Sequence, residues 1–272
     1  MSARSFIGSV VVVAILGGCS KPTGSGAGDG TGAGARQGEP LRIAAAADLA
    51  LAFGDIKTDF EKRTGKKIEM SFGSTGLLAK QIAEGAPFDV FAAANVSFVD
   101  DVVQAKACDE STKALYARGR IVVWSKDPSA LPKDISGLTD ARYAKIAIAN
   151  PEHAPYGRAA QQALTKSGVW ETVKPRMVHG ENVQQTQVYA RTGNADVAIV
   201  ALSLAVQSEG AYLLIPDELH EPLDQALVIC HGGIRSKTNE AHAFVDYVGS
   251  PEGRAVMRKY GFLLPGEALP PK

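Results

Sequence analysis

From Leu41 onward, short apolar or β-branched runs alternate with segments of helical period. This alternation is typical of parallel sheets covered by helices, so the sequence predicts an α/β fold. We expect strands at residues 41–46, 67–72, 90–93, 120–124, 145–149, 176–179, 195–200 and 226–230. We expect helices at residues 51–64, 77–84, 158–167, 183–191, 240–248 and 252–259.

The N-terminus predicts export. Arg4 precedes an apolar run, residues 7–16, that is too short to span a bilayer, and small residues lead to Cys19. We expect a signal peptide over residues 1–18. Its ending, residues 16–19, resembles a bacterial lipobox, which implies that Cys19 is diacylated and becomes the new N-terminus. The alternative is an ordinary signal peptide with an incidental cysteine nearby.

Residues 19–40 predict a flexible tether. Glycine recurs at every second position from Gly24 to Gly34, and the segment offers almost nothing apolar to bury. A coil of about 21 residues spans roughly 25 Å on average. We therefore expect a protein of the periplasm or cell surface that touches the membrane only through its lipid.

Composition limits the classes of partner. The 29 basic and 29 acidic residues balance, so there is no positive excess to bind a nucleic-acid backbone. A length of 272 residues is enough for one large α/β unit or for two lobes.

Two further cysteines leave their state open. In an oxidising compartment Cys108 and Cys230 could pair, but the sequence does not bring their Cα atoms within bridging distance. Two buried free thiols are the simpler interpretation.

Four junctions between a strand and a helix carry small or hydroxylated residues. They are residues 46–49, 72–76, 150–157 and 180–183. Ligands of open α/β sheets bind beyond the carboxyl ends of the strands, where helix N-termini present free N–H groups and a positive dipole end. The sequence therefore predicts an anion site. Asp48, Ser74, Thr75 and Asn182 are also preferred N-cap residues, so capping alone would place any one of them there.

The same motifs resemble the periplasmic molybdate-binding proteins, which have the two-lobed type II binding-protein fold. The resemblance covers nearly all of residues 41–265 and is carried, in order, by residues 43–49, 71–82, 85–91, 150–157, 181–183 and 259–262. It implies two lobes, each a mostly parallel sheet covered by helices. It also implies two chain crossings, near residues 119–122 and 227–230. Residues 41–120 and 231–272 would form lobe 1, and residues 121–230 would form lobe 2.

The resemblance also implies a function: capture of a tetrahedral dianion, molybdate or tungstate, by N–H and hydroxyl donors without a countercharge. The implied contacts are the backbone of Ala47 and Asp48, the donors of Ser74 and Thr75, and the amides around Tyr156 and Val183. The implied partners are the permease and ATPase of an ABC importer. We expect a monomer without cofactor or catalysis. The alternatives are another tetrahedral oxyanion, such as phosphate or sulfate, or a sensor that is not coupled to import.

Two positions depart from the family pattern. Asp48 stands where many members have serine, and Ala201 where they have a tyrosine that reaches the anion; Tyr156 is a candidate substitute hydroxyl donor. An ionised Asp48 about 4 Å from one ligand charge would cost about 4 kcal/mol at an effective dielectric near 20. We therefore expect Asp48 to turn back and cap its own helix. The alternative is a protonated ligand such as hydrogen phosphate, whose O–H needs an acceptor.

Enzyme motifs do not fit. Residues 73–76 have neither the spacing of a nucleophile elbow nor the lysine of a phosphate-binding P-loop. The five histidines are scattered without the spacing of metal ligands.

Overall fold

The computed structural model describes residues 39–232 and 238–267. The expected signal peptide, Cys19 and the tether up to residue 38 lie outside the described residues, so those predictions stay predictions.

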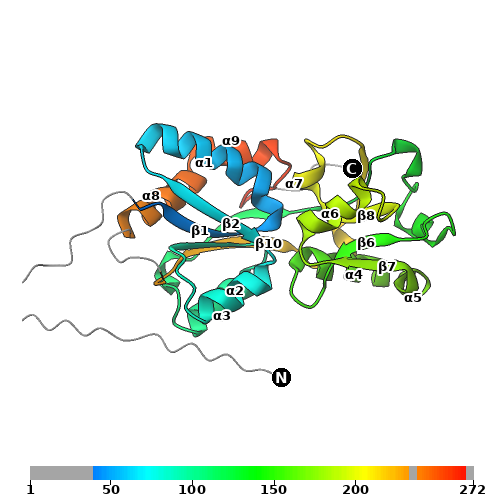
Figure 1. The fold of residues 1–272 in the computed structure, drawn as a ribbon, viewed down its shortest axis with the longest axis horizontal. Helices are drawn as coiled ribbons and strands as arrows, with labels where there is room; N and C mark the ends of the chain where they lie inside the picture. Colours follow the sequence, from blue (N-terminus) through cyan, green and yellow to red (C-terminus); the bar gives the residue numbers. More distant parts are fainter. Residues whose placement is uncertain (1–38, 233–237, 268–272) are drawn as a thin grey trace, which may run out of the picture. The chain divides into compact units, whose positions relative to one another are not determined.

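Two five-stranded sheets form the core (Figure 1). The first, in the order β2-β1-β3-β10-β4, consists of β1 (Leu41–Ala46), β2 (Ile68–Gly73), β3 (Val90–Ala93), β4 (Ala114–Gly119) and β10 (Leu223–Ile229). The second, in the order β7-β6-β8-β5-β9, consists of β5 (Ile121–Ser125), β6 (Ile146–Ala149), β7 (Met177–Gly180), β8 (Val197–Ala201) and β9 (Ala211–Leu214).

Both sheets are mixed, where mostly parallel sheets were expected. In the first sheet β1 pairs parallel with β2 and β3, while β10 runs antiparallel to β3 and β4. In the second sheet β6 pairs parallel with β7 and β8, while β5 runs antiparallel to β8 and β9. The α/β class is confirmed, and the antiparallel strands are those that carry the chain between the lobes.

Nine α-helices lie in the described ranges together with several short 3-10 helices, of which η1 matters for the site. These elements are η1 (Ala47–Leu49) and the α-helices α1 (Ala50–Thr64), α2 (Thr75–Ala83), α3 (Val96–Gln104), α4 (Pro155–Lys166), α5 (Trp170–Val173), α6 (Val183–Arg191), α7 (Leu202–Ala205), α8 (Thr238–Gly249) and α9 (Pro251–Lys259).

Helices cover both faces of the first sheet (Figure 1). The side chains of β1 alternate: Ile43 and Ala45 pack in the cluster of α1, α8 and α9, while Ala44 packs in the cluster of α2 and α3. In the second sheet α4 and α6 both pack against β6 and β8. Gly157 lets α4 approach closely, because a Cβ there would lie 2.0 Å from the carbonyl oxygen of Ala149.

The chain crosses between the sheets twice. The first crossing is at Arg120, between the last residue of β4 and the first residue of β5. The second crossing was expected near residues 227–230, and this is wrong: β10, Leu223–Ile229, already pairs with β3 and β4, so the crossing precedes Leu223. The expectation failed because β10 is a continuous strand of the first sheet that reaches back to the boundary between the lobes.

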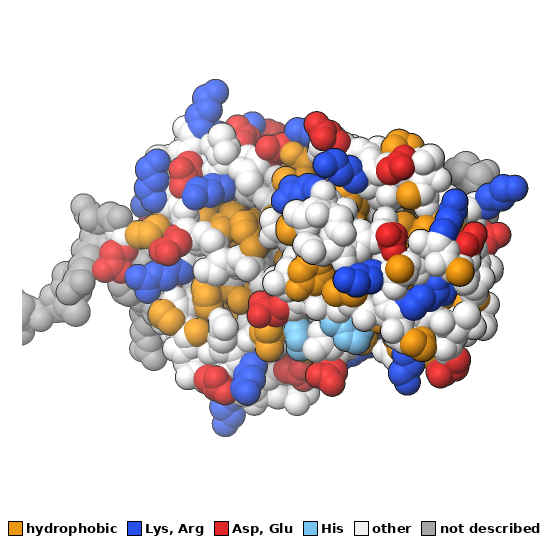
Figure 2. Space-filling model, turned by 45° about the vertical axis from the view of Figure 1, so that its right-hand side comes forward, with side chains coloured by type: hydrophobic (Ala, Val, Ile, Leu, Met, Phe, Trp, Pro, Cys, Tyr) orange, Lys and Arg blue, Asp and Glu red, His pale blue; other side chains and the backbone are white. Residues whose placement is uncertain are grey.

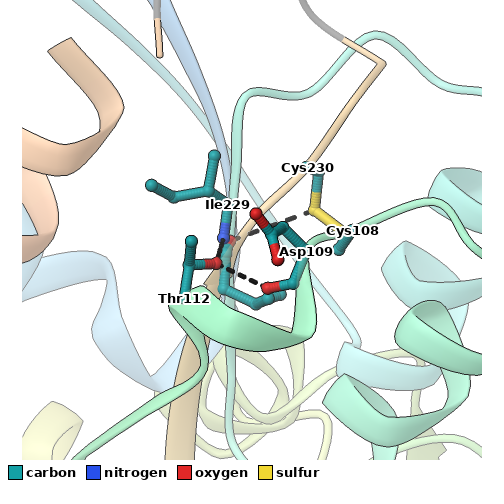
Figure 3. The surroundings of a disulfide bond; sticks show 6 residues. Cys108, Asp109, Thr112, Ile229 and Cys230 are labelled. Carbon is teal, nitrogen blue, oxygen red and sulfur yellow. Dashed lines mark hydrogen bonds between the residues drawn. A yellow bond between two sulfur atoms is a disulfide. The ribbon is translucent and has the colours of Figure 1, made fainter. Parts of the chain in front are cut away.

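A disulfide joins Cys108 to Cys230, so the interpretation as free thiols is wrong (Figure 3). The two residues face each other in an isolated antiparallel β-bridge, and their sulfur atoms are bonded at 2.03 Å. Next to the disulfide, the backbone N–H of Ile229 donates to Thr112 Oγ1, and that hydroxyl donates to the carbonyl oxygen of Asp109. The bond therefore fastens the end of β10 to the segment that follows α3.

Basic and acidic side chains are interspersed over the face of the molecule shown in Figure 2. None of the helices in the described ranges combines the length and the apolar character that a membrane crossing requires.

Candidate site at four helix N-termini

Four helices begin just beyond the carboxyl ends of strands, two in each lobe. η1 follows β1 and α2 follows β2, while α4 and α6 follow β6 and β7. The backbone N–H groups of Asp48, Thr75, Tyr156 and Val183 lie in these first turns and bond to no other residue of the described chain. The N–H of Asp48 also interacts with the carboxyl group of its own side chain. First-turn N–H groups have no partner inside their helix and carry its positive dipole end. The arrangement supplies donors for an anion.

Contacts across the two lobes bring these N-termini together. The Tyr156 hydroxyl at the start of α4 donates to Asp48 Oδ2 at 2.9 Å. The N–H of Gly76 in α2 donates to the carbonyl oxygen of His153, just before α4, at 2.9 Å. Helix α6 packs against η1. All six predicted site residues are buried: Ala47, Asp48, Ser74, Thr75, Tyr156 and Val183.

The Asp48 side chain does not cap a helix, so that prediction is wrong. No side-chain capping bond forms at the start of η1 or α1. Instead, Oδ2 of Asp48 accepts from the Tyr156 hydroxyl at 2.9 Å and from Gln225 Nε2 at 2.6 Å. The local sequence favours a cap, but two donors from distant segments outcompete the nearby N–H groups.

The other carboxyl oxygen of Asp48 is buried and has no hydrogen-bond partner in another residue. The side chain is 0% exposed, and no lysine, arginine or histidine of the described ranges bonds to it. Burial therefore raises the pKa of Asp48 to about 6, although the hydrogen bonds from Gln225 and Tyr156 oppose the shift. Asp48 is held close to the point where it gains or loses a proton.

Tyr156 lies where the lobes meet. Its ring fits against β4 because residue 119 is glycine: a Cβ there would lie 2.1 Å from the Tyr156 oxygen. The hydroxyl donates to Asp48, and burial together with the Asp48 charge raises the pKa of Tyr156 well above its usual value. The hydroxyl predicted to reach the anion is therefore bonded to Asp48, while the N–H of Tyr156 has no partner among the described residues.

Ser74 and Thr75 also use their hydroxyls for tertiary contacts. Ser74 Oγ lies 2.8 Å from the carbonyl oxygen of His153 and 2.7 Å from its Nδ1. Thr75 Oγ1 accepts from the N–H of Ala94 at 3.3 Å. Neither side chain caps α2, and Ser74 links the first lobe directly to the loop before α4.

Asn182 behaves as a local cap. Its Oδ1 accepts from the N–H groups of Gln184 and Gln185 in the first turn of α6. This leaves the N–H of Val183 as the one first-turn donor that points to no partner in the described chain. At the position of the missing tyrosine, Ala201 is buried at the end of β8.

Sequence reasoning missed four residues of the site: Gln225, Tyr116, Ser203 and His153. Gln225 Oε1 accepts from the Tyr116 hydroxyl at 2.8 Å, and Ser203 Oγ donates to the carbonyl oxygen of Asp48 at 2.7 Å. Gln225 could have been noticed, because it directly precedes the apolar second half of β10. The other three give no sequence signal.

A resident metal has no support in the described residues, since no group of three or more histidine, cysteine, aspartate or glutamate side chains is placed to hold one. The site consists of N–H donors, hydroxyls, one amide and one buried carboxyl group.

Two lobes that hold helix N-termini around a shared, cation-free site define a bi-lobed solute-binding protein. Residues 41–263 match the family described as bacterial extracellular solute-binding protein, and the chain belongs to that family. It is 36% identical over 233 residues to the molybdate-binding protein ModA of Azotobacter vinelandii, covering 84% of this chain and 91% of the relative.

A second sequence relative and a solved structure are also similar to this chain. A putative ABC transporter substrate-binding lipoprotein of Bacillus subtilis, YvgL, is 30% identical over 261 residues, covering 94% of this chain and 96% of the relative. The solved structure of the Azotobacter vinelandii periplasmic molybdate-binding protein superposes with a TM-score of 0.78 at 28% identity, covering 83% of this chain and 99% of that one. These relatives are binding proteins by description, and the Azotobacter vinelandii structure shares the fold of this chain.

Proposed function

We propose that this protein captures molybdate or tungstate between its two lobes and delivers it to an ABC importer. The observation that carries the proposal is the meeting of four helix N-termini. Their N–H groups at Asp48, Thr75, Tyr156 and Val183 bond to no other residue of the described chain. Fixed neutral donors bind a fully deprotonated anion well, because every anion oxygen is an acceptor. The molybdate-binding relatives support this choice of ligand.

Calorimetric titration of the purified domain with molybdate, tungstate, sulfate and phosphate tests the ligand. We expect molybdate and tungstate to bind with similar affinity and sulfate to bind far more weakly, since a rigid cage selects by size. Absence of binding by all four anions would refute the proposal.

Phosphate is the second candidate, and one observation favours it. The partnerless oxygen of Asp48 could accept a hydrogen bond from the O–H of a protonated anion. In the same titration, tight phosphate binding without molybdate binding would select this function.

The proposed anchor is Cys19, and the lipoprotein description of the Bacillus subtilis relative supports it. Fractionation of cells expressing the full chain tests it: the wild type should sediment with membranes, and Cys19→Ala should not. If both proteins divide equally between the membrane and soluble fractions, Cys19 is not the membrane anchor.

The proposed partners are a permease and an ATPase. We also propose that the protein is a monomer and that it binds its ligand without catalysing a reaction. Reconstituted uptake of molybdate should require the binding protein together with both partners. Uptake by the permease and ATPase alone at the same rate would argue for a sensor.

A further inference from the structure

The carboxyl group of Asp48 lies among the first-turn donors of the proposed anion site. It is the one carboxyl group in the four first turns, and it is fully buried. Its Oδ2 is saturated by Tyr156 and Gln225, whereas Oδ1 has no hydrogen-bond partner in another residue. The only other donor recorded at this carboxyl group is the backbone N–H of Asp48 itself. A buried oxygen that no other residue of the described chain bonds to is costly, so a ligand atom is the natural group to complete it.

No lysine, arginine or histidine in the described part of the chain bonds to the Asp48 carboxyl group to neutralise it. Tyr156 faces it from α4, Ser203 from α7 and Gln225 from β10, with Tyr116 of β4 behind Gln225. Burial and the Asp48 charge raise the pKa values of Tyr116 and Tyr156 well above the usual value, so both phenols stay neutral. Helix α6 also packs on η1, but none of its described side chains bonds to the carboxyl group.

An ionised Asp48 and a dianion cannot share this site. An unscreened carboxylate has no donor to offer, and two negative groups in a buried environment repel each other strongly. A protonated carboxyl group solves both difficulties, since it is neutral and gains one O–H donor. Tyr156 and Gln225 already occupy Oδ2 as donors, which leaves Oδ1 to carry the proton.

We propose that Asp48 is a ligand-recognition residue that takes up one proton from solution when the dianion binds and donates it, through Oδ1–H, to an anion oxygen. The proposal rests on the proposed capture of a tetrahedral dianion. It predicts that capture is coupled to pH: binding is tightest in mildly acidic solution and weakens as pH rises, because ionised Asp48 must first be protonated. A pKa near 6 in the free protein places this change in the neutral range.

The test is calorimetric titration of the purified protein with sodium molybdate, at fixed pH, in buffers that differ in protonation enthalpy. At pH 7.5 we expect uptake of about one proton per anion bound, and at pH 5 about a tenth of a proton. Above pH 7 the dissociation constant should rise about tenfold per pH unit.

Two variants assign the proton to its residue. Asp48→Asn keeps an acceptor for Tyr156 and Gln225 and replaces the acid by a permanent N–H donor, so its proton uptake should vanish and its affinity should no longer change with pH. Asp55→Asn is the matched control: Asp55 lies on the same stretch of chain but bonds to Lys259 and Tyr260 at the surface, and it should leave the proton uptake unchanged.

The possible outcomes separate the two proposals. Failure of the wild type to bind any of the four anions refutes the proposed function. Molybdate binding without proton uptake leaves that function intact and overturns the role of Asp48. If phosphate binds and molybdate does not, Asp48 would act as a hydrogen-bond acceptor, and its proposed role as a proton donor is overturned. If Asp48→Asn does not fold, the proton count of the wild type still decides.

Discussion

The turn from β1 into η1 and the turn from β7 into α6 each present a preferred capping residue, yet the two residues behave differently. Asn182 accepts from the first-turn N–H groups of Gln184 and Gln185, as its local sequence predicts. The Asp48 side chain forms no capping bond and instead accepts from Tyr156 and Gln225, which are 108 and 177 positions away in the sequence. A cap residue obeys local rules where it is partly exposed, and tertiary donors override them where it is buried.

The largest expected effect is a pH dependence of the free energy of unfolding that arises at Asp48 and not at Asn182. The raised pKa of Asp48, about 6 against 3.8, means that the folded state holds the proton more tightly than the unfolded state. This tighter proton binding stabilises the folded state fully below pH 3.8. The folded state loses on the order of 3 kcal/mol of this stabilisation as pH rises through about 6. Urea unfolding at pH 4 and pH 7 should show this loss for the wild type relative to Asp48→Asn. Parallel pH profiles of the two proteins would contradict a buried, unneutralised carboxyl group.

Removal of the distant donor should have the next largest effect. Gln225→Leu deprives Asp48 of one hydrogen bond and leaves the buried Tyr116 hydroxyl with a weak 3.5 Å contact to the carbonyl oxygen of Ala93. We expect the free energy of unfolding to fall by about 2 kcal/mol, and to fall further at pH 7.5 than at pH 5, because the lost bond stabilised the ionised form of Asp48. An equal loss at both pH values would mean that Gln225 acts only through packing.

The local cap should contribute less and should not depend on pH. Asn182→Ala removes the acceptor for two N–H groups of α6 and should lower the free energy of unfolding by about 1 kcal/mol at pH 5 and at pH 7.5 alike. Asn182→Asp serves as a control that keeps the acceptor. A pH-dependent loss in Asn182→Ala would remove the contrast between the two turns.

Ser74 should show the smallest effect, because its hydroxyl bonds across the lobes to His153, which is only partly buried and can bond to water instead. We expect Ser74→Ala to lower the free energy of unfolding by about 0.5 kcal/mol. Ser97→Ala, which loses a hydroxyl contact to Asn95 within the first lobe, is a matched control for the size of a single hydroxyl. A loss above 2 kcal/mol would place Ser74 in a buried network comparable to that of Asp48.

Much of the fold could be predicted because its central strands are continuous apolar runs. The bounds of β1 and β3 agree with the prediction, and those of the other predicted strands differ by a few residues. β4 and β9 were missed; both are edge strands, as β2 and β7 are. Arg118 interrupts the apolar residues of β4, and β9 is an apolar run of only four residues. In the fold β4 exposes Leu115, and β9 exposes Tyr212 and Leu214.

The positions of the site could be predicted, whereas the partners of its side chains could not. Small and hydroxylated residues after a strand mark a helix N-terminus whatever the tertiary structure is, and Asp48, Ser74, Tyr156 and Val183 all lie at such places. The partner of each side chain depends on strands that meet only in the folded chain. Asp48 meets Gln225 because β10 returns to the first sheet, a crossing that the sequence placed too late.

The disulfide gives the second lobe an unusual covalent setting. Cys108 and Cys230 are 122 positions apart and enclose every strand from β5 to β9. The second sheet therefore lies within a loop of chain that the disulfide closes on the first lobe. A protease that cuts this loop once leaves the two fragments joined by the disulfide, and they separate only after reduction.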